Sequence, residues 1–218
     1  MTHDAGQLPS DVTPGAVLGA PGALLVIISG PAGVGKDTIL RELKELPSAV
    51  RREFVVTYKS RDPRPEEVDG EHYHFVTPER FREIWRAGGL LEAAEVHGQW
   101  SGTPVAGVRR ALGEGRDAVL KIDVQGAATV KGLVPDALRI FVSPPSIDEL
   151  RRRLIERATE TPEQLVIRLR NAEIEMQSAS EYDYRVVNVT DGASDTARLI
   201  DALIDTEHAR RGTRRIRV

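Results

Sequence analysis

A short apolar segment that leads into a glycine-rich loop constrains this chain more than any other feature. Residues 24–29 read Leu-Leu-Val-Ile-Ile-Ser, which is typical of a strand buried on both faces of a parallel sheet. Glycines in such a loop let successive backbone N–H groups converge on one anion, and the N-terminus of a following helix adds a positive dipole end. A lysine at the end of the loop neutralises phosphate oxygens. The Gly-x4-Gly-Lys spacing therefore predicts a phosphate-binding loop (P-loop), made of Gly30, Pro31, Ala32, Gly33, Val34, Gly35 and Lys36.

The residue after the lysine departs from the usual form of this motif. Ser or Thr ordinarily stands there and offers its hydroxyl to Mg²⁺. This chain has Asp37, followed by Thr38. A carboxylate at this position either helps to hold Mg²⁺, directly or through water, or repels a phosphate. Asp37 and Thr38 are the side chains that we expect to lie beside the metal.

Strand and helix patterns alternate along the rest of the chain. Further strands are predicted at residues 53–57, 72–76, 118–123, 139–142 and 184–189. Helices are predicted after the loop up to Pro47, from Pro78 to Trp85, after Ser146, after Thr161 and over 194–210. This order predicts an α/β fold with a mostly parallel sheet, and ligands bind such sheets at the carboxyl ends of the strands.

Composition excludes several classes of protein. The 218 residues carry a net charge of −3, which argues against a nucleic-acid partner held by bulk electrostatics. The absence of cysteine excludes disulfides, thiolate metal sites and cysteine nucleophiles. No apolar run approaches the roughly 20 residues that span a membrane, and the N-terminus lacks the pattern of a secretory signal. We expect a cytoplasmic protein with a flexible extension over residues 1–22, one domain over 23–210 and a solvated basic tail over 211–218.

Two arginines three residues apart, Arg61 and Arg64, stand in a proline-flanked loop upstream of Tyr73. Two guanidinium groups and a phenol can hold a second phosphate. Taken alone, the pattern fits solvated loop arginines better. Its weight comes from the segments that follow it in order. They read LEAAEVHG (91–98), SGTP (101–104), IDVQGA (122–127), PPS (144–146) and YDYRVVN (182–188).

In order and spacing, these segments and the loop motif resemble the guanylate kinases, from about Leu24 to Arg210. The resemblance implies a monomeric or homodimeric enzyme that moves the γ-phosphoryl group of ATP to GMP with Mg²⁺. It also implies a P-loop kinase core with a mostly parallel five-stranded sheet flanked by helices, over about 23–57 and 105–210. A small mixed α/β nucleotide-binding arm, over about 58–104, and a helical lid, over about 151–172, complete the expected fold.

The resemblance also assigns roles to particular side chains. Arg61, Arg64 and Tyr73 match residues that bind the acceptor phosphate, and Thr57 stands where the family usually has a serine hydroxyl. Glu92 and Thr103 match the guanine readers, because a carboxylate accepts from the N1–H and 2-amino groups while a hydroxyl serves O6. The alternative for Glu92 is a solvated acid at a helix end. Asp123 matches an acid beside the P-loop, with a helix N-cap as its alternative.

The lid and the adenine contact follow from the same comparison. The catalytic arginines implied by the resemblance are Arg153, Arg157 and Arg168, although a solvated basic face is the commoner fate of such a run. Arginines there would stabilise the charge that spreads over the transferring group. Asn188 stands where the family contacts adenine, and a plain turn residue is its alternative.

Several positions depart from the family pattern. Ser101 stands where the family usually has a tyrosine for the acceptor phosphate, and it is too short to make the same reach. Lys59 replaces a small hydroxylic residue, Glu66 a turn glycine, and Lys121 an acid two residues before Asp123. The two lysines either substitute for the lost tyrosine or mark an acceptor with more negative charge.

Two other functions stay open on the sequence alone. Ribose 1,5-bisphosphate kinases share the Gly-Lys-Asp of residues 35–37, but Glu92 and Thr103 suit a guanine nucleotide better. A guanylate-kinase-like module that binds protein partners without catalysis is the second alternative. Such modules tend to lose the phosphate loop, which this chain keeps.

Overall fold

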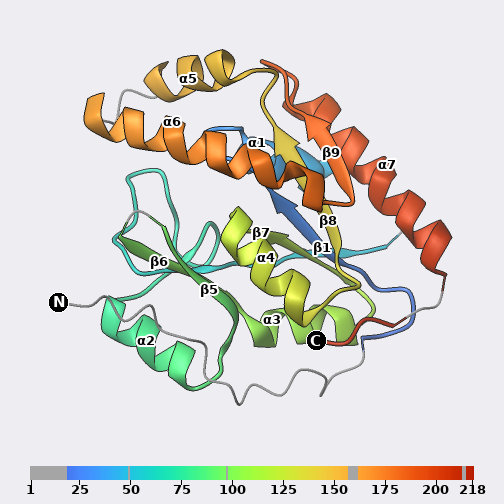
Figure 1. The fold of residues 1–218 in the computed structure, drawn as a ribbon. Helices are drawn as coiled ribbons and strands as arrows, with labels where there is room; N and C mark the ends of the chain where they lie inside the picture. The colour runs from blue at the N-terminus through green and yellow to red at the C-terminus, as the bar shows by residue number, and fades with distance from the viewer. Residues whose placement is uncertain (1–18, 49, 97, 157–161, 213–214) are drawn as a thin grey trace.

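The computed structural model describes residues 19–48, 50–96, 98–156, 162–212 and 215–218. A five-stranded sheet forms the centre of the fold, in the order β2-β7-β1-β8-β9, and every neighbouring pair in it is parallel. The predicted α/β fold is therefore confirmed (Figure 1). The strands are β1 (Leu25–Ser29), β2 (Arg52–Phe54), β7 (Asp117–Lys121), β8 (Leu138–Ser143) and β9 (Tyr184–Val187).

Helices cover both faces of this sheet and explain its continuous apolar strands. Leu25 and Ile27 pack with the helices on one face, whereas Val26 and Ile28 pack with those on the other. All five residues of β1 are buried, as a strand between two helical layers requires. The first layer holds α3 (Val105–Gly113) and α4 (Val124–Leu133), and the second holds α1 (Lys36–Glu45) and α7 (Ala193–Arg211).

A second, smaller sheet has the order β4-β3-β6-β5 and mixes one parallel with two antiparallel pairs. It lies with α2 at the lower left of Figure 1, beside the central sheet. Thr77 caps α2 as predicted, since its side chain accepts a hydrogen bond from the backbone N–H of Arg80. The strands are β3 (Tyr58–Lys59), β4 (His74–Phe75), β5 (Leu90–Val96) and β6 (Gln99–Pro104), and the helix is α2 (Pro78–Arg86). The strand predicted at 72–76 thus lies in the smaller sheet.

Two helices run across the top of Figure 1, over the carboxyl ends of the central strands. They are α5 (Ile147–Glu156) and α6 (Pro162–Gln177), and a 3-10 turn, η1 (Ser178–Glu181), follows them. Leu150 and Leu154 of α5 pack on Leu169 and Ala172 of α6. This small core holds the two helices to each other.

Both ends of the described chain are tied to the domain. The backbone N–H of Gly19 donates to the carbonyl of Ile216 at 2.8 Å, and that of Ala20 donates to Leu112 at 2.7 Å. Ile216 and Val218 are buried in the core on the α3 and α4 side. The prediction of a solvated tail is therefore wrong for these two residues, because apolar side chains alternate with arginines there and turn inward. Residues 1–18 of the predicted extension lie outside the described residues.

Within the described part of the chain, no helix has the length and apolar character needed to cross a membrane.

Candidate active site

The glycine-rich loop follows the carboxyl end of β1 and leads into α1, where the sequence places it. Gly30 has a φ of 140°, and a Cβ on it would overlap the carbonyl oxygen of Val142 on β8. Gly35 has a left-handed backbone and forms the N-cap of α1. Only glycine adopts these conformations without strain, and a loop of this kind can present backbone N–H groups to an anion.

Lys36 folds back over the loop that it ends. Its Nζ donates to the carbonyl oxygen of Gly30 and, at 3.1 Å, to that of Pro31. Burial lowers the pKa of Lys36 to about 8, although the neighbouring carboxylates of Glu175 and Asp37 oppose that shift. An ammonium with a pKa lowered by burial gains stability when an anion arrives beside it.

Asn188 holds the loop from the side. Its Nδ2 donates to the carbonyl of Val34 at 2.8 Å, and its Oδ1 accepts from the hydroxyl of Thr196 at 3.1 Å. The side chain is buried, and both its polar ends bond within the protein. These contacts give Asn188 a structural role at the P-loop, while its contact with adenine stays a prediction.

Asp37 and Thr38 lie exposed in the first turn of α1, directly after Lys36. A carboxylate and a hydroxyl there fit Mg²⁺, because this ion is usually held by one or two protein oxygens, waters and substrate phosphates. Asp37 also forms an ion pair with the Nζ of Lys121, at the end of β7. Among the described residues, no group of three or more histidine and acidic side chains is placed to hold a metal by itself.

Of the predicted acceptor-phosphate arginines, Arg61 lies beside Tyr73, whereas the side chain of Arg64 is exposed. The Nζ of Lys121 donates to the Tyr73 hydroxyl at 2.8 Å, and the Cζ of Arg61 lies 5.8 Å from the centroid of the Tyr73 ring. Arg61 makes two hydrogen bonds to Glu67, at 2.6 and 2.7 Å, and the backbone N–H of Arg64 donates to the same carboxylate. Glu67, which we did not predict as a site residue, therefore orders the loop that carries both arginines.

Glu92 and Thr103 face each other on β5 and β6. They are register partners in the antiparallel pair, and the Thr103 hydroxyl donates to Oε1 of Glu92 at 2.6 Å. Glu92 is only 2% exposed, which excludes the alternative of a solvated helix-end acid. Burial raises the pKa of Glu92 to about 7, against the hydrogen bond from Thr103. A Cβ on Gly126 of α4 would come within 2.6 Å of Glu92 Oε2, so α4 closes tightly over this carboxylate.

Asp123 and Thr57 lie close to the same region. The Asp123 carboxylate accepts from the backbone N–H of Gly126 at 2.9 Å and caps α4, so its structural alternative is realised. Asp123 also acts electrostatically on both Lys59 and Glu92. Thr57 is buried and its carbonyl accepts from the backbone N–H of His74. Their roles toward an acceptor nucleotide stay predictions.

The helices over the site bring one predicted arginine and one unpredicted acid to the P-loop. Arg153 donates to Glu149 at 2.9 Å and to the carbonyl of Asn188 at 3.0 Å. Glu175 of α6 accepts a hydrogen bond from the backbone N–H of Ala32. Burial raises the pKa of Glu175. The sequence alone did not distinguish this acid from the other charged residues of α6. Arg168 lies half-buried on α6, and Arg157 lies outside the described residues.

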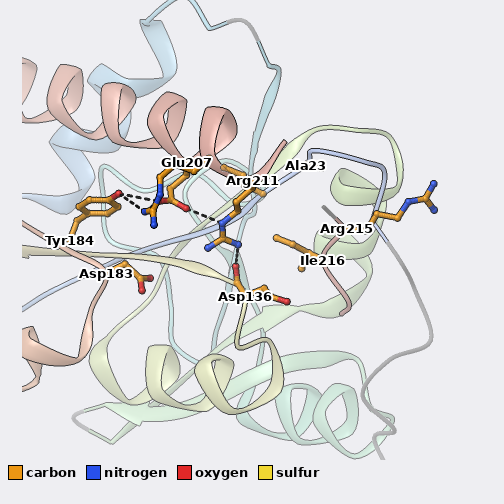
Figure 2. A pocket seen from close by; sticks show the side chains of 10 residues that line it. Ala23, Asp136, Asp183, Tyr184, Glu207, Arg211, Arg215 and Ile216 are labelled. Atoms are coloured by element: carbon orange, nitrogen blue, oxygen red, sulfur yellow. Dashed lines mark hydrogen bonds and ion pairs between the residues drawn. The ribbon is translucent and has the colours of Figure 1, made fainter. Parts of the chain in front are cut away.

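A surface pocket of about 690 Å³ lies away from this site. Its lining includes Ala23 and Leu24, so it opens at the amino ends of the central strands, opposite the P-loop. In its lining, Figure 2 shows Glu207 between Tyr184 and Arg211, and the Glu207 carboxylate accepts from the Tyr184 hydroxyl at 3.0 Å and from Arg211 at 2.9 Å. Its acid is thus already engaged within the protein.

Comparison with known proteins agrees with this arrangement. A family model described as guanylate kinase matches residues 23–207. A guanylate kinase of Clostridium perfringens is 42% identical over 188 residues, which cover 86% of this chain and 85% of the relative. One of Nocardia farcinica is 47% identical over 167 residues, which cover 75% and 85% of the two chains.

A solved structure gives the same result. The crystal structure of guanylate kinase from Anaplasma phagocytophilum superposes with a TM-score of 0.70 at 28% identity and covers 88% of each chain. The sequence match, the superposition and the paired Glu92 and Thr103 beside a P-loop agree with one another. The chain belongs to the guanylate kinase family.

Proposed function

We propose that the protein transfers the γ-phosphoryl group of ATP to GMP, and to dGMP, with GDP or dGDP and ADP as products. The observation that carries this proposal is the buried Glu92–Thr103 pair, joined at 2.6 Å. A carboxylate in this position accepts from the two adjacent donors of guanine, whereas adenine lacks the N1–H and the 2-amino group. Adenine would leave the buried acid unpaired, which is strongly unfavourable.

The P-loop and the lid arginines provide the donor side of the reaction. The backbone N–H groups of residues 32–36 and the Lys36 ammonium would hold the β- and γ-phosphates of ATP. Asp37 and Thr38 would hold Mg²⁺ together with those phosphates, and the ion would shield their charge during transfer. Arg153, Arg157 and Arg168 would stabilise the charge on the transferring group. Asn188 would keep the loop in place and contact adenine.

The acceptor needs no general base. A phosphate oxygen of GMP is already an anion, and it attacks the γ-phosphorus while the bond to the β,γ-bridging oxygen breaks and ADP leaves. Arg61, Arg64 and Tyr73 would hold that phosphate in line, and Thr57 and Asp123 would border the same pocket. Positioning and charge stabilisation therefore carry the rate.

A comparison of acceptors tests this function. GMP, dGMP, AMP and ribose 1,5-bisphosphate are each supplied with ATP and Mg²⁺, and ADP release is followed. We expect turnover with GMP and dGMP and at least 100-fold less with AMP, in line with the cost of unpaired buried groups. Faster turnover of ribose 1,5-bisphosphate than of GMP would overturn the proposal.

Lys36→Ala should abolish turnover, and full activity in that variant would place the donor site elsewhere. Cytoplasmic location and a monomeric or homodimeric state remain predictions.

A further inference from the structure

Lys59 and Ser101 are direct partners across two antiparallel strands. The register of β3 and β6 pairs Lys59 with Ser101 and Tyr58 with Gly102. Directly opposed residues in an antiparallel pair project from the same face, with Cβ atoms about 5 Å apart. A long side chain at position 59 therefore covers the space that a long side chain at position 101 would otherwise reach.

The Lys59 ammonium points into the predicted acceptor-phosphate region. Its Nζ lies 5.2 Å from the centroid of the Tyr73 ring, and the Nζ of Lys121 lies 4.4 Å from the same centroid. Burial lowers the pKa of Lys59, and the positive charges of Lys121 and Arg61 act in the same direction, while Asp123 and Glu92 oppose it. A half-buried ammonium beside other cations is unfavourable until an anion joins them.

The neighbouring cations, Arg61 and Lys121, already make ion pairs and hydrogen bonds within the protein. Arg61 has both terminal nitrogens on Glu67, and Lys121 is shared between Asp37 and the Tyr73 hydroxyl. Among the described residues, Lys59 forms no ion pair and its ammonium makes no hydrogen bond. The most available positive charge beside Tyr73 thus belongs to the residue that faces the short Ser101.

We propose that Lys59 binds the phosphate of the acceptor nucleotide and makes from β3 the contact that Ser101 is too short to make from β6. Lys121 is a second cation of the same pocket, and Asp37 positions it against Tyr73. This inference rests on the proposed function, since it concerns how the acceptor GMP is held. It adds to Arg61, Arg64 and Tyr73 a phosphate ligand that replaces a hydroxyl by a full positive charge.

Calorimetric binding of GMP and of guanosine tests the proposal without catalysis. Lys59→Met keeps the length and apolar stem of the side chain and removes its charge. We expect this variant to bind GMP on the order of 10- to 100-fold more weakly, the usual value of a charge-assisted hydrogen bond, with guanosine binding unchanged. Lys44→Met is the matched control, because Lys44 is exposed in the last turn of α1. Unchanged GMP binding in Lys59→Met, or an equal loss for guanosine, would overturn the assignment.

A reciprocal pair of variants tests the exchange across the strands. Lys59→Ser should bind GMP as weakly as Lys59→Met. The double variant that also carries Ser101→Tyr should bind GMP at least tenfold more tightly than Lys59→Ser alone. Equal affinity of the single and double variants, with unchanged thermal unfolding, would overturn the exchange. GDP formation by the unaltered protein is measured beside these titrations. If the protein makes GDP while Lys59→Met binds GMP normally, only this inference fails, and if it makes none, the proposed function fails first.

Discussion

Glu92 and Lys36 are ionisable side chains whose burial brings their pKa values close to neutrality. The pKa of Glu92 rises to about 7 and that of Lys36 falls to about 8. In the free protein, Glu92 is therefore partly protonated near pH 7, and Lys36 loses its charge as the pH rises through about 8. The substrates predicted for the two sites would restore that charge, because guanine donors favour a carboxylate and phosphates favour an ammonium.

Binding of GMP should therefore release a proton from Glu92. At pH 7 about half of the Glu92 side chains are protonated in the free protein, so ionisation on binding releases about half a proton. The measurement is calorimetry of GMP binding in buffers of different ionisation enthalpy. The Glu92→Gln variant serves as reference, because the GMP phosphate can also titrate. Identical proton release by both proteins would contradict the assignment of Glu92.

Binding of ATP should make Lys36 take up a proton, the opposite of the proton release expected from Glu92 on GMP binding. At pH 8 about half of the Lys36 side chains are neutral, and nearby phosphates would raise the pKa again, so the protein takes up about half a proton. The same buffer series at pH 8 measures the uptake. Lys36→Met should abolish it and weaken ATP binding. Uptake that survives this substitution would show that another group carries the proton.

The packing of α4 against β5 determines where the Glu92 carboxylate sits. Gly126 has an ordinary helical backbone, yet a Cβ there would collide with Glu92 Oε2. Gly132, on the same helix, has open space around it within 4 Å. Helices favour alanine over glycine by about 1 kcal/mol, so a glycine at 126 lowers the stability of α4. The Glu92 carboxylate on β5 explains this glycine, because it occupies the space that a Cβ at 126 would need.

Gly126→Ala should lower activity without lowering the stability of the fold. We expect the thermal unfolding temperature to stay the same or rise, while kcat/KM for GMP falls on the order of tenfold or more, because the carboxylate must move. Gly132→Ala is the control and should leave kcat/KM unchanged. Full activity in Gly126→Ala would mean that the Glu92 position is not critical for GMP.

Sequence patterns predicted the buried central strands well and the smaller sheet poorly. The apolar run at 24–29 and the N-cap at Thr77 have local causes, so both could be seen without a structure. β5 was missed because Glu92, a buried acid, interrupts its apolar pattern. The ion pair of Asp37 with Lys121 joins residues 84 positions apart, and no local pattern reveals it. The position of each predicted site residue toward a ligand depends on neighbours that are distant in sequence, so local patterns do not predict its ligand contacts.

The two ends of the described part of the chain pack together on the side of the protein that lies away from the P-loop. Gly19 pairs with Ile216, and His208 of α7 contacts the buried carboxylate of Asp117 at 2.9 Å. The same Asp117 accepts from the backbone N–H of Leu24, next to β1. The period-two alternation of Ile216 and Val218 with arginines was a signal for this packing, but the net basic charge of the tail concealed it.

Ile216→Ala should therefore lower stability without changing catalysis. Truncation of a buried isoleucine to alanine costs about 2–5 kcal/mol, which denaturant unfolding can measure. Turnover of GMP at a temperature where the variant is folded should be unaffected, since Ile216 lies at the amino ends of the strands. Arg217→Ala, at an exposed position between the two buried side chains, is the control. Equal stability of both variants would contradict the packed tail.

Transfer of a labelled phosphoryl group tests most directly whether two neighbouring anion sites face each other across one reaction. The protein is incubated with Mg²⁺, GMP and ATP labelled at the γ-phosphorus, and the products are separated. We predict that the label appears in GDP, and that it stays in ATP when GMP is replaced by AMP. Label released only as inorganic phosphate, at a rate that does not depend on GMP, would contradict the account.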